Sequence, residues 1–203
     1  MNQPPIRIAF DALILSTATP SGVEHAVART LRGLLEHDGQ NQYLVCQVRG
    51  EEAARTCPAN PRARYHRVLP RRVAGRIGRI AWQQVAEPLF LRLHKADVLH
   101  APAYVSPLVG VPCPVVLSVY DVLALKRPDL CKGANAAHYR LVMPRAARRA
   151  ARVIVPTEYV RADVVRWLRV PEERVEVVLP PLRPAPADDA AQRQAAAARL
   201  GLP

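Results

Sequence analysis

The chain has 203 residues, half of them hydrophobic, so it can bury the core of one domain and part of a second. No apolar stretch approaches the roughly 20 residues that cross a bilayer, and no signal peptide precedes the chain, which predicts a soluble or surface-bound cytosolic protein with reduced thiols. The formal net charge is +12, and the 4 cysteines form no C-x-x-C pair and have no histidine at metal spacing, so no metal site is expected.

Short apolar runs alternate with helical patterns along the chain. Continuous runs of this kind are typical of strands that are buried on both faces. The predicted strands are Ile6–Leu13, Tyr43–Val48, Arg64–Leu69, Asp97–His100, Val115–Val119, Arg152–Val155 and Val175–Leu179. Strands that alternate with helices predict an α/β fold with a doubly wound, mostly parallel, Rossmann-like sheet.

Three helices are predicted between these strands. The first follows Ser21, a candidate N-cap, and ends before Gly39. The second covers apolar positions from Val73 to Leu89, and Pro88 is expected to kink or interrupt it. The third extends from about Glu158 to Arg169.

The end of the chain differs in composition from the rest. Four prolines between Pro180 and Pro186 predict a stiff linker, and an alanine-rich helical segment at Ala190–Leu200 follows it. A lone amphipathic segment of this length has little to bury itself against. We therefore expect a domain over residues 1–182 and a linker over residues 183–203 that leads toward a further domain.

Two segments carry most of the positive charge. Eight arginines and no acidic residue lie between Ala53 and Ala86, and six basic residues and no acidic one lie between Leu130 and Thr157. The arginines at helical spacing are Arg72, Arg76, Arg79, Arg145, Arg148, Arg149 and Arg152. They are either a solvated face or a patch for anionic lipid headgroups. Nucleic acid is not expected, because aromatic residues make up only 5% of the chain.

Polar residues follow several of the predicted strands. Ligands of open α/β sheets bind outside the carboxyl ends of the strands. The candidate residues there are Ser21, Gly22, Val23, His100, Tyr120, Asp121, Thr157 and Glu158. Structural roles are the alternative: Ser21 and Thr157 are good helix caps, a lone histidine is often structural, and Tyr120 with Asp121 would form a helix cap or a turn.

Taken in order, several stretches resemble the N-terminal domain of the GT-B glycosyltransferases of family 4. They are "IRIAFDAL" with "SGVEHAVARTLRGLL", "IAWQQVAEPLFLRLHKADVLHAPAYVSPL", "PVVLSVYDVLALKRPDL" and "AARRAARVIVPTEYVRADVVRWLRVPEERVEVVLPPL". The terminal "AARLGLP" is similar to the start of the linker into the second domain. The resemblance covers nearly the whole chain.

The resemblance implies a two-domain retaining enzyme whose N-terminal domain holds the acceptor. Tyr120 and Asp121 stand where the family has its active-site His-Asp, and Thr157 and Glu158 stand at its Ser-Glu position. Ser21, Gly22 and Val23 would line the side that holds the diphosphate and the acceptor, and His100 ends the D-V-x-H strand. No cofactor is implied, because the nucleotide-sugar is a substrate held mainly by the absent second domain. The chain alone is therefore not expected to transfer sugar.

The expected partners are a sugar or lipid-linked sugar acceptor, an anionic membrane surface and a separate chain that carries the donor domain. The expected location is the cytoplasm, or the inner face of the cell membrane as a peripheral protein. The alternative is a non-catalytic domain that binds anionic lipid or a protein. A Rossmann-like methyltransferase or nucleotide enzyme is disfavoured, because no glycine-rich G-x-G-x-x-G fingerprint follows the first predicted strand.

Overall fold

One parallel sheet organises the chain. The computed structural model describes residues 4–16, 21–48, 60–131, 133–181, 194 and 197–199. Within them seven strands lie in the order β3-β2-β1-β4-β5-β6-β7, and every neighbouring pair is parallel. The strands are β1 (Arg7–Asp11), β2 (Gln42–Val48), β3 (Ala63–Leu69), β4 (Val98–Ala101), β5 (Val115–Ser118), β6 (Arg152–Val155) and β7 (Val175–Val177). The predicted doubly wound α/β fold is confirmed.

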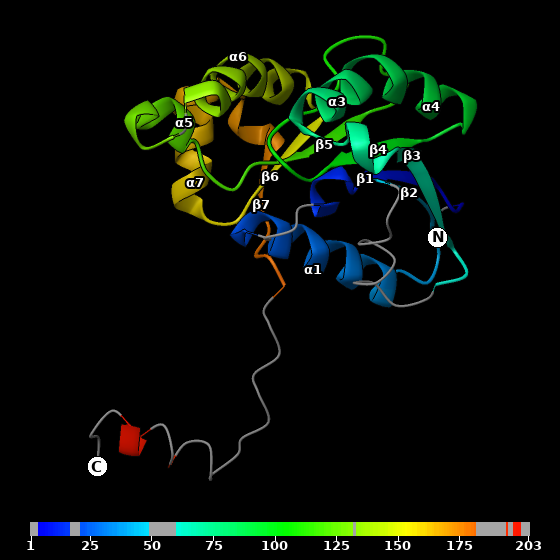
Figure 1. The fold of residues 1–203 in the computed structure, drawn as a ribbon, viewed down its shortest axis with the longest axis horizontal. Helices are drawn as coiled ribbons and strands as arrows, with labels where there is room; N and C mark the ends of the chain where they lie inside the picture. Colours follow the sequence, from blue (N-terminus) through cyan, green and yellow to red (C-terminus); the bar gives the residue numbers. More distant parts are fainter. Residues whose placement is uncertain are drawn as a thin grey trace.

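Helices cover both faces of this sheet. In Figure 1, α1 lies on one face, and α3, α4 and α6 lie on the other. The α-helices are α1 (Gly22–His37), α3 (Arg76–Ala81), α4 (Glu87–Leu93), α5 (Leu123–Lys126), α6 (Gly133–Arg149) and α7 (Glu158–Asp163). Two π turns, η3 (Trp82–Ala86) and η5 (Val164–Leu168), extend α3 and α7. Short 3-10 turns are η1 (Leu13–Ser16), η2 (Arg71–Val73), η4 (Pro128–Leu130) and η6 (Glu172–Arg174).

The strand order reverses at β1. The chain proceeds from β1 outward through β2 to β3, and then returns to the other side of β1 with β4 and proceeds outward again to β7. The connections after β1 and β4 therefore diverge and leave a crevice between them at the carboxyl ends. A topological switch point of this kind is where open α/β sheets bind their ligands.

A capping box begins α1, as the sequence predicted for Ser21. The hydroxyl of Ser21 accepts a hydrogen bond from the N–H of Val23 at 3.3 Å, and the carboxylate of Glu24 accepts one from the N–H of Ser21 at 2.9 Å. These bonds satisfy backbone donors that a helix start leaves unpaired, and Glu24 also complements the helix dipole. The first turn of α1 is thus fixed next to the end of β1.

Pro88 changes the hydrogen-bond pattern of the second helix just before it, without breaking the helix. The ring of a proline clashes with the carbonyl four residues earlier, which here belongs to Gln84. The chain widens into the π turn η3, where the N–H of Glu87 bonds the carbonyl of Trp82. From Arg76 to Leu93 the helix therefore continues through the proline.

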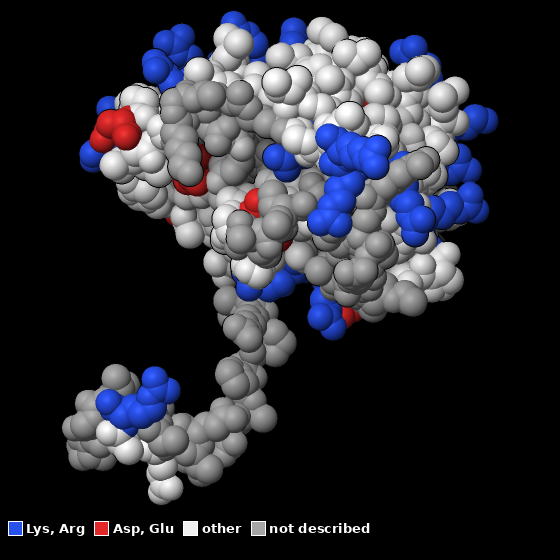
Figure 2. Space-filling view, in the orientation of Figure 1, with Lys and Arg blue, Asp and Glu red and all other residues white. Residues whose placement is uncertain are grey.

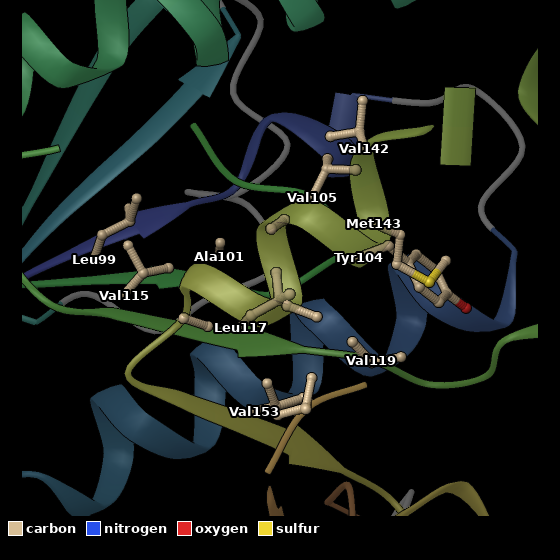
Figure 3. Packing of buried hydrophobic residues seen from close by; sticks show 14 of the residues in the cluster. Leu99, Ala101, Tyr104, Val105, Val115, Leu117, Val119, Val142, Met143 and Val153 are labelled. Carbon is tan, nitrogen blue, oxygen red and sulfur yellow. The ribbon is translucent and has the colours of Figure 1, made fainter. Parts of the chain in front are cut away.

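The core consists of two main layers, one on each side of the sheet. Between the sheet and α6 lies a large aliphatic cluster that includes Leu117, Val153 and Met143, all at most 1% exposed. Figure 3 shows this packing, with the ring of Tyr104 beside Met143. On the other face, Phe10 and Val45 pack against Val27, Leu31 and other residues of α1. Both faces of the central strands are buried, which explains their continuously apolar sequence.

The predicted linker lies almost wholly outside the described residues. The last strand, β7, ends at Val177, two residues before the predicted end of its apolar run. Of the helices in the described ranges, none combines the length and apolar character that a membrane crossing requires.

Candidate functional site

A polar cavity of about 330 Å³ opens at the switch point between β1 and β4. Its walls come from η1, the first turn of α1, α3 with η3, the loop after β4, and α6. The lining residues are Asp11, Leu13, Ile14, Glu24, Arg79, Ile80, Gln83, Pro102, Ala103, Val105, His138 and Tyr139. We call this cavity the rim pocket. It is the strongest candidate site, because it combines the position expected from the fold with two carboxylates, a guanidinium and an amide.

Asp11 is the most buried polar group of the rim pocket. Its side chain ends β1 and is 5% exposed. One carboxylate oxygen accepts a hydrogen bond from the N–H of Leu13 at 3.0 Å, and the other accepts one from Nε2 of Gln83 at 2.6 Å. Burial raises the pKa of Asp11, while the bonds from Gln83 and Leu13 and the charge of Arg79 act in the opposite direction. The carboxylate is thereby held in one orientation at the floor of the pocket.

Groups from three separate elements face Asp11 across the pocket. Arg79 lies in the last turn of α3, Gln83 lies one turn later in η3, and Glu24 lies in the first turn of α1. Carboxylates accept hydrogen bonds from hydroxyls, and guanidinium and amide groups donate them. An arrangement of fixed acceptors and donors around a cavity is suited to a ligand rich in hydroxyl groups, such as a sugar.

The predicted residues Ser21 and Gly22 lie at the same corner, directly before Glu24. Ser21 serves as the N-cap, so its hydroxyl is already used by the helix. Gly22 is exposed, and a Cβ added there would meet no atom within 4 Å. Val23 is half-buried and packs against the core. The open space at Gly22 leaves room for a ligand to approach the helix start.

Asp121 and Tyr120 have different surroundings, although they are adjacent in sequence. Asp121 is exposed and accepts hydrogen bonds from the hydroxyl of Tyr104 at 2.7 Å and from the N–H of Leu123 at 2.8 Å. Tyr104 has a left-handed backbone, with φ of 63°, which is uncommon for a tyrosine. Asp121 thus ties the loop after β4 to the loop after β5.

The ring of Tyr120 lies on the α1 side of the sheet. It packs against both core clusters, contacts the ring of Tyr104 edge-on and hydrogen-bonds Thr30 of α1. Burial raises the pKa of Tyr120 to about 12. Tyr120 lines a second cavity rather than the rim pocket, so the structure does not bring it together with Asp11 and Glu24.

This second cavity has a volume of about 510 Å³ and lies between α1, the strands β4 to β6 and the segment that follows β7. His100 and Ser118 contribute to its wall, with His100 Nε2 and Ser118 Oγ 3.1 Å apart. The imidazole is 7% exposed and meets the ring of Phe10 edge-on, and burial lowers the pKa of His100 to about 4. His100 is therefore neutral and well packed at physiological pH. The other walls are mainly aliphatic and proline side chains, which suit a polar ligand less well than the rim pocket does.

Thr157 and Glu158 line neither cavity, and the same is true of Ser21, Gly22, Val23 and Asp121. Thr157 is the N-cap of α7, and its hydroxyl accepts a hydrogen bond from the N–H of Val160 at 3.2 Å. Glu158 is exposed and lies 3.4 Å from the guanidinium of Arg161. These contacts match the capping role that the sequence offered as the plainer reading.

The seven candidate arginines fall into two groups. Arg72 is exposed, Arg79 lines the rim pocket, and the side chain of Arg76 is outside the described part of the structure. In the second group, Arg145 and Arg148 donate to the carbonyls of Leu141 and Leu168, and Arg149 and Arg152 donate to those of Leu108 and Ala151. All four side chains of the second group remain exposed at the surface.

Sequence reasoning missed Asp11, Gln83, Glu24 and Tyr104. Asp11 lies within the apolar run of "IAFDALIL", and a carboxylate inside such a run needs buried partners. That signal could have identified it. Its partner Gln83 is 72 positions away, and no local pattern indicates such a contact.

Glu87 is a buried carboxyl group near Asp11. It is 1% exposed, neither carboxyl oxygen has a hydrogen-bond partner among the described residues, and burial followed by the charge of Asp11 raises its pKa well above the ordinary value. The folded state therefore keeps a proton that the unfolded state loses as pH rises above the ordinary glutamate pKa. Since the unfolded state then binds fewer protons, the free energy of unfolding should fall as pH rises from about 4.5 toward the raised value.

The variant E87Q should remove this contribution and be more stable than the wild-type chain at pH 8 by about 1–3 kcal/mol. Urea denaturation at several pH values between 5 and 8 measures the effect. E173Q, at an exposed glutamate in η6, is the matched control and should follow the wild-type profile. Equal pH profiles for E87Q and wild type would show that Glu87 is ionised in the folded state.

Comparison with known proteins gives a family match over most of the chain. The model of Glycosyltransferase Family 4 matches residues 20–185. Among solved structures, a glycosyltransferase from Rickettsia africae ESF-5 is similar to the chain, with a TM-score of 0.46 and 12% sequence identity. The match covers 99% of this chain and 51% of that chain, so this chain spans about half of that enzyme's length. No curated protein sequence matches significantly.

Proposed function

The chain belongs to glycosyltransferase family 4, and we propose that it is the acceptor-binding half of a retaining, nucleotide-sugar-dependent glycosyltransferase. The observation that carries the proposal is the rim pocket. It lies at the switch point of the sheet and surrounds a fixed carboxylate, Asp11, with the polar side chains of Glu24, Arg79 and Gln83. Such a pocket can hold an acceptor sugar by its hydroxyl groups.

In this proposal, the chain and a second domain hold different parts of the substrates. The open corner at Gly22 would let a diphosphate approach the start of α1, where the positive end of the helix dipole favours anions. The donor sugar and most of its nucleotide would then be held by a second domain, in the same chain or a separate one. Transfer would pass through an oxocarbenium-like sugar and retain its anomeric configuration, and this chain alone would be inactive.

Of the predicted residues, Ser21, Gly22 and Val23 are the ones that we place beside the substrate. For Asp121 we propose a positioning role, supported by its bonds to the Tyr104 hydroxyl and the Leu123 N–H. For Tyr120, we propose that its hydroxyl acts through the contact with Thr30 on α1 rather than on the sugar directly. His100, Thr157 and Glu158 would support the walls of the site.

Complementation tests the proposed function. The purified chain is mixed with a chain that supplies the donor domain, and release of nucleotide and transfer of sugar from a nucleotide-sugar are measured, with the anomeric proton of the product followed by NMR. We expect activity in the mixture only, with retained configuration. Activity of the donor half that is unchanged by adding this chain would contradict the proposal.

Gly22 provides a test of the ligand approach. The variant G22A should fold with unchanged stability, because its Cβ meets open space, but it should transfer sugar at least about tenfold more slowly, because the methyl group occupies space that the ligand needs. Gly39 at the other end of α1 also has nothing near its Cβ position, so G39A is the matched control and should be fully active. Equal rates of sugar transfer by G22A and G39A would show that the ligand does not approach Gly22.

We further propose that the arginine-rich surface brings this half-enzyme to an anionic membrane as a peripheral protein on its inner face, where a lipid-linked acceptor would be found. The support is charge alone, namely the two segments that have many basic and no acidic residues. A non-catalytic domain with the same surface is the second candidate function, and the complementation assay distinguishes the two.

A further inference from the structure

The outer face of the α3–η3–α4 helix is apolar although it faces solvent. Ile77, Val85 and Leu93 are exposed by 78%, 75% and 71%, and Leu89 and Val73 are also more than half exposed. These residues, with the exposed Ala81, occupy every fourth position from Val73 to Leu93. Large aliphatic side chains so regularly placed on a surface helix are too many to be scattered exceptions.

The π turn η3 keeps this row on one side of the helix. In an α-helix four residues make slightly more than one turn, so side chains four positions apart shift forward around the helix axis. In a π turn four residues make less than one turn, so the shift is backward. Because η3 lies in the middle of the row, the two shifts partly cancel. Ile77, Val85 and Leu93 can therefore meet one flat surface together.

The loop after β4 extends the apolar surface at its side. The side chain of Gln84 in η3 holds this loop, since its Oε1 accepts from the N–H of Leu108 at 3.0 Å and its Nε2 donates to the carbonyl of Ser106 at 3.1 Å. Val109, which is 65% exposed, therefore lies next to α4, and a Cβ on Gly110 would contact Pro88. We call the row and Val109 together the apolar face.

Basic side chains border the apolar face. Arg71 and Arg72 precede it, Arg92 and Lys95 lie at its far end, and all four are exposed. Arg149 reaches the carbonyl of Leu108 at 2.6 Å, at the edge formed by the loop. Figure 2 shows the pale surface over α3 and α4 with blue side chains around it. Between Asn60 and Ala96 the one acidic residue in the sequence is Glu87, which is buried.

We infer that the apolar face inserts between the headgroups of an anionic bilayer, so that the α3–η3–α4 helix lies in the plane of the membrane surface. Aliphatic side chains that would enter the acyl boundary, with basic residues around them and no exposed acid among them, match an anionic lipid surface in both shape and charge. This inference deepens the proposed membrane contact: attraction by charge alone would leave the apolar face in water, whereas insertion buries it.

Vesicle co-sedimentation of the full chain tests the inference, with vesicles of phosphatidylcholine alone or with about one-third phosphatidylglycerol. The wild-type chain should bind the anionic vesicles at about 0.15 M salt and retain part of this binding at about 0.5 M, where charge attraction is strongly screened. The variant I77Q/V85Q/L89Q should bind at least about tenfold more weakly. The control L130Q/V178Q/L179Q changes three exposed aliphatic residues on other elements and should bind like wild type.

Three outcomes would overturn the inference. They are no binding by the wild-type chain, equal binding by the I77Q/V85Q/L89Q variant, and a concentration-dependent dimer in sedimentation velocity that this variant abolishes, which would show that the apolar face covers a second copy. Circular dichroism establishes that each variant is folded. The assay contains no sugar, so its failure would leave the proposed transfer function untouched, and failure of complementation would leave the membrane result standing.

Discussion

The variant D11N should lower sugar transfer by the reconstituted enzyme at least about 100-fold while leaving the chain folded. Asparagine has nearly the shape of aspartate, so it can still accept the hydrogen bond from the N–H of Leu13, and the amide of Gln83 can turn to pair with it. The substitution therefore removes the negative charge and one acceptor from the floor of the rim pocket. A sugar hydroxyl that donates to Asp11 would lose its partner.

The control for D11N is D97N. Asp97 also accepts a backbone hydrogen bond, from the N–H of Arg7 at 2.7 Å, but it lies at the amino end of the neighbouring strand. D97N should transfer sugar at the wild-type rate. If D11N did so too, with thermal unfolding unchanged, the carboxylate of Asp11 would be a structural group and the rim pocket would lose its central residue.

The variant G78A should destabilise the chain by at least about 3 kcal/mol. A Cβ at Gly78 would lie 1.7 Å from the carbonyl oxygen and 2.9 Å from the carbonyl carbon of Val73. Both atoms belong to the backbone, so no side chain can move aside, and either η2 or α3 must shift. Arg79 and Gln83 follow on the same helix, so the rim pocket should lose its arrangement as well.

Urea denaturation of G78A and G75A measures this effect. A Cβ at Gly75 meets nothing within 4 Å, so G75A should unfold within about 1 kcal/mol of the wild-type chain. If G78A were equally stable, the close contact between η2 and α3 could not be what positions Arg79 and Gln83.

The fold could be predicted from the sequence because its strands carry a strong local signal. Strands such as Val115–Ser118 are buried on both faces, so nearly every residue in them is apolar. Ser21 is a candidate N-cap in the sequence, and in the structure it caps α1. The apolar run at Ile6–Leu13 was predicted two residues too long at its end, because Asp11 turns the chain into η1 by accepting from Leu13.

The site could be predicted only as an edge of the sheet. The carboxyl ends of the strands identified the rim, but which side chains point into the crevice depends on contacts between distant segments. Gln83 reaches Asp11 from another helix, and Tyr120 turns toward Thr30 beneath α1. The contact between Tyr104 and Asp121 depends on a left-handed backbone at Tyr104, which the sequence does not signal.

Amide NMR of the chain titrated with a hexose tests whether the rim pocket holds the acceptor sugar. We expect the signals of residues 11–14, of Glu24 and of Gln83 to shift in a saturable manner, and D11N to weaken these shifts. Shifts confined to Leu34 and Leu179 would place the sugar in the cavity beneath α1, and the absence of any saturable shift would likewise contradict binding in the rim pocket.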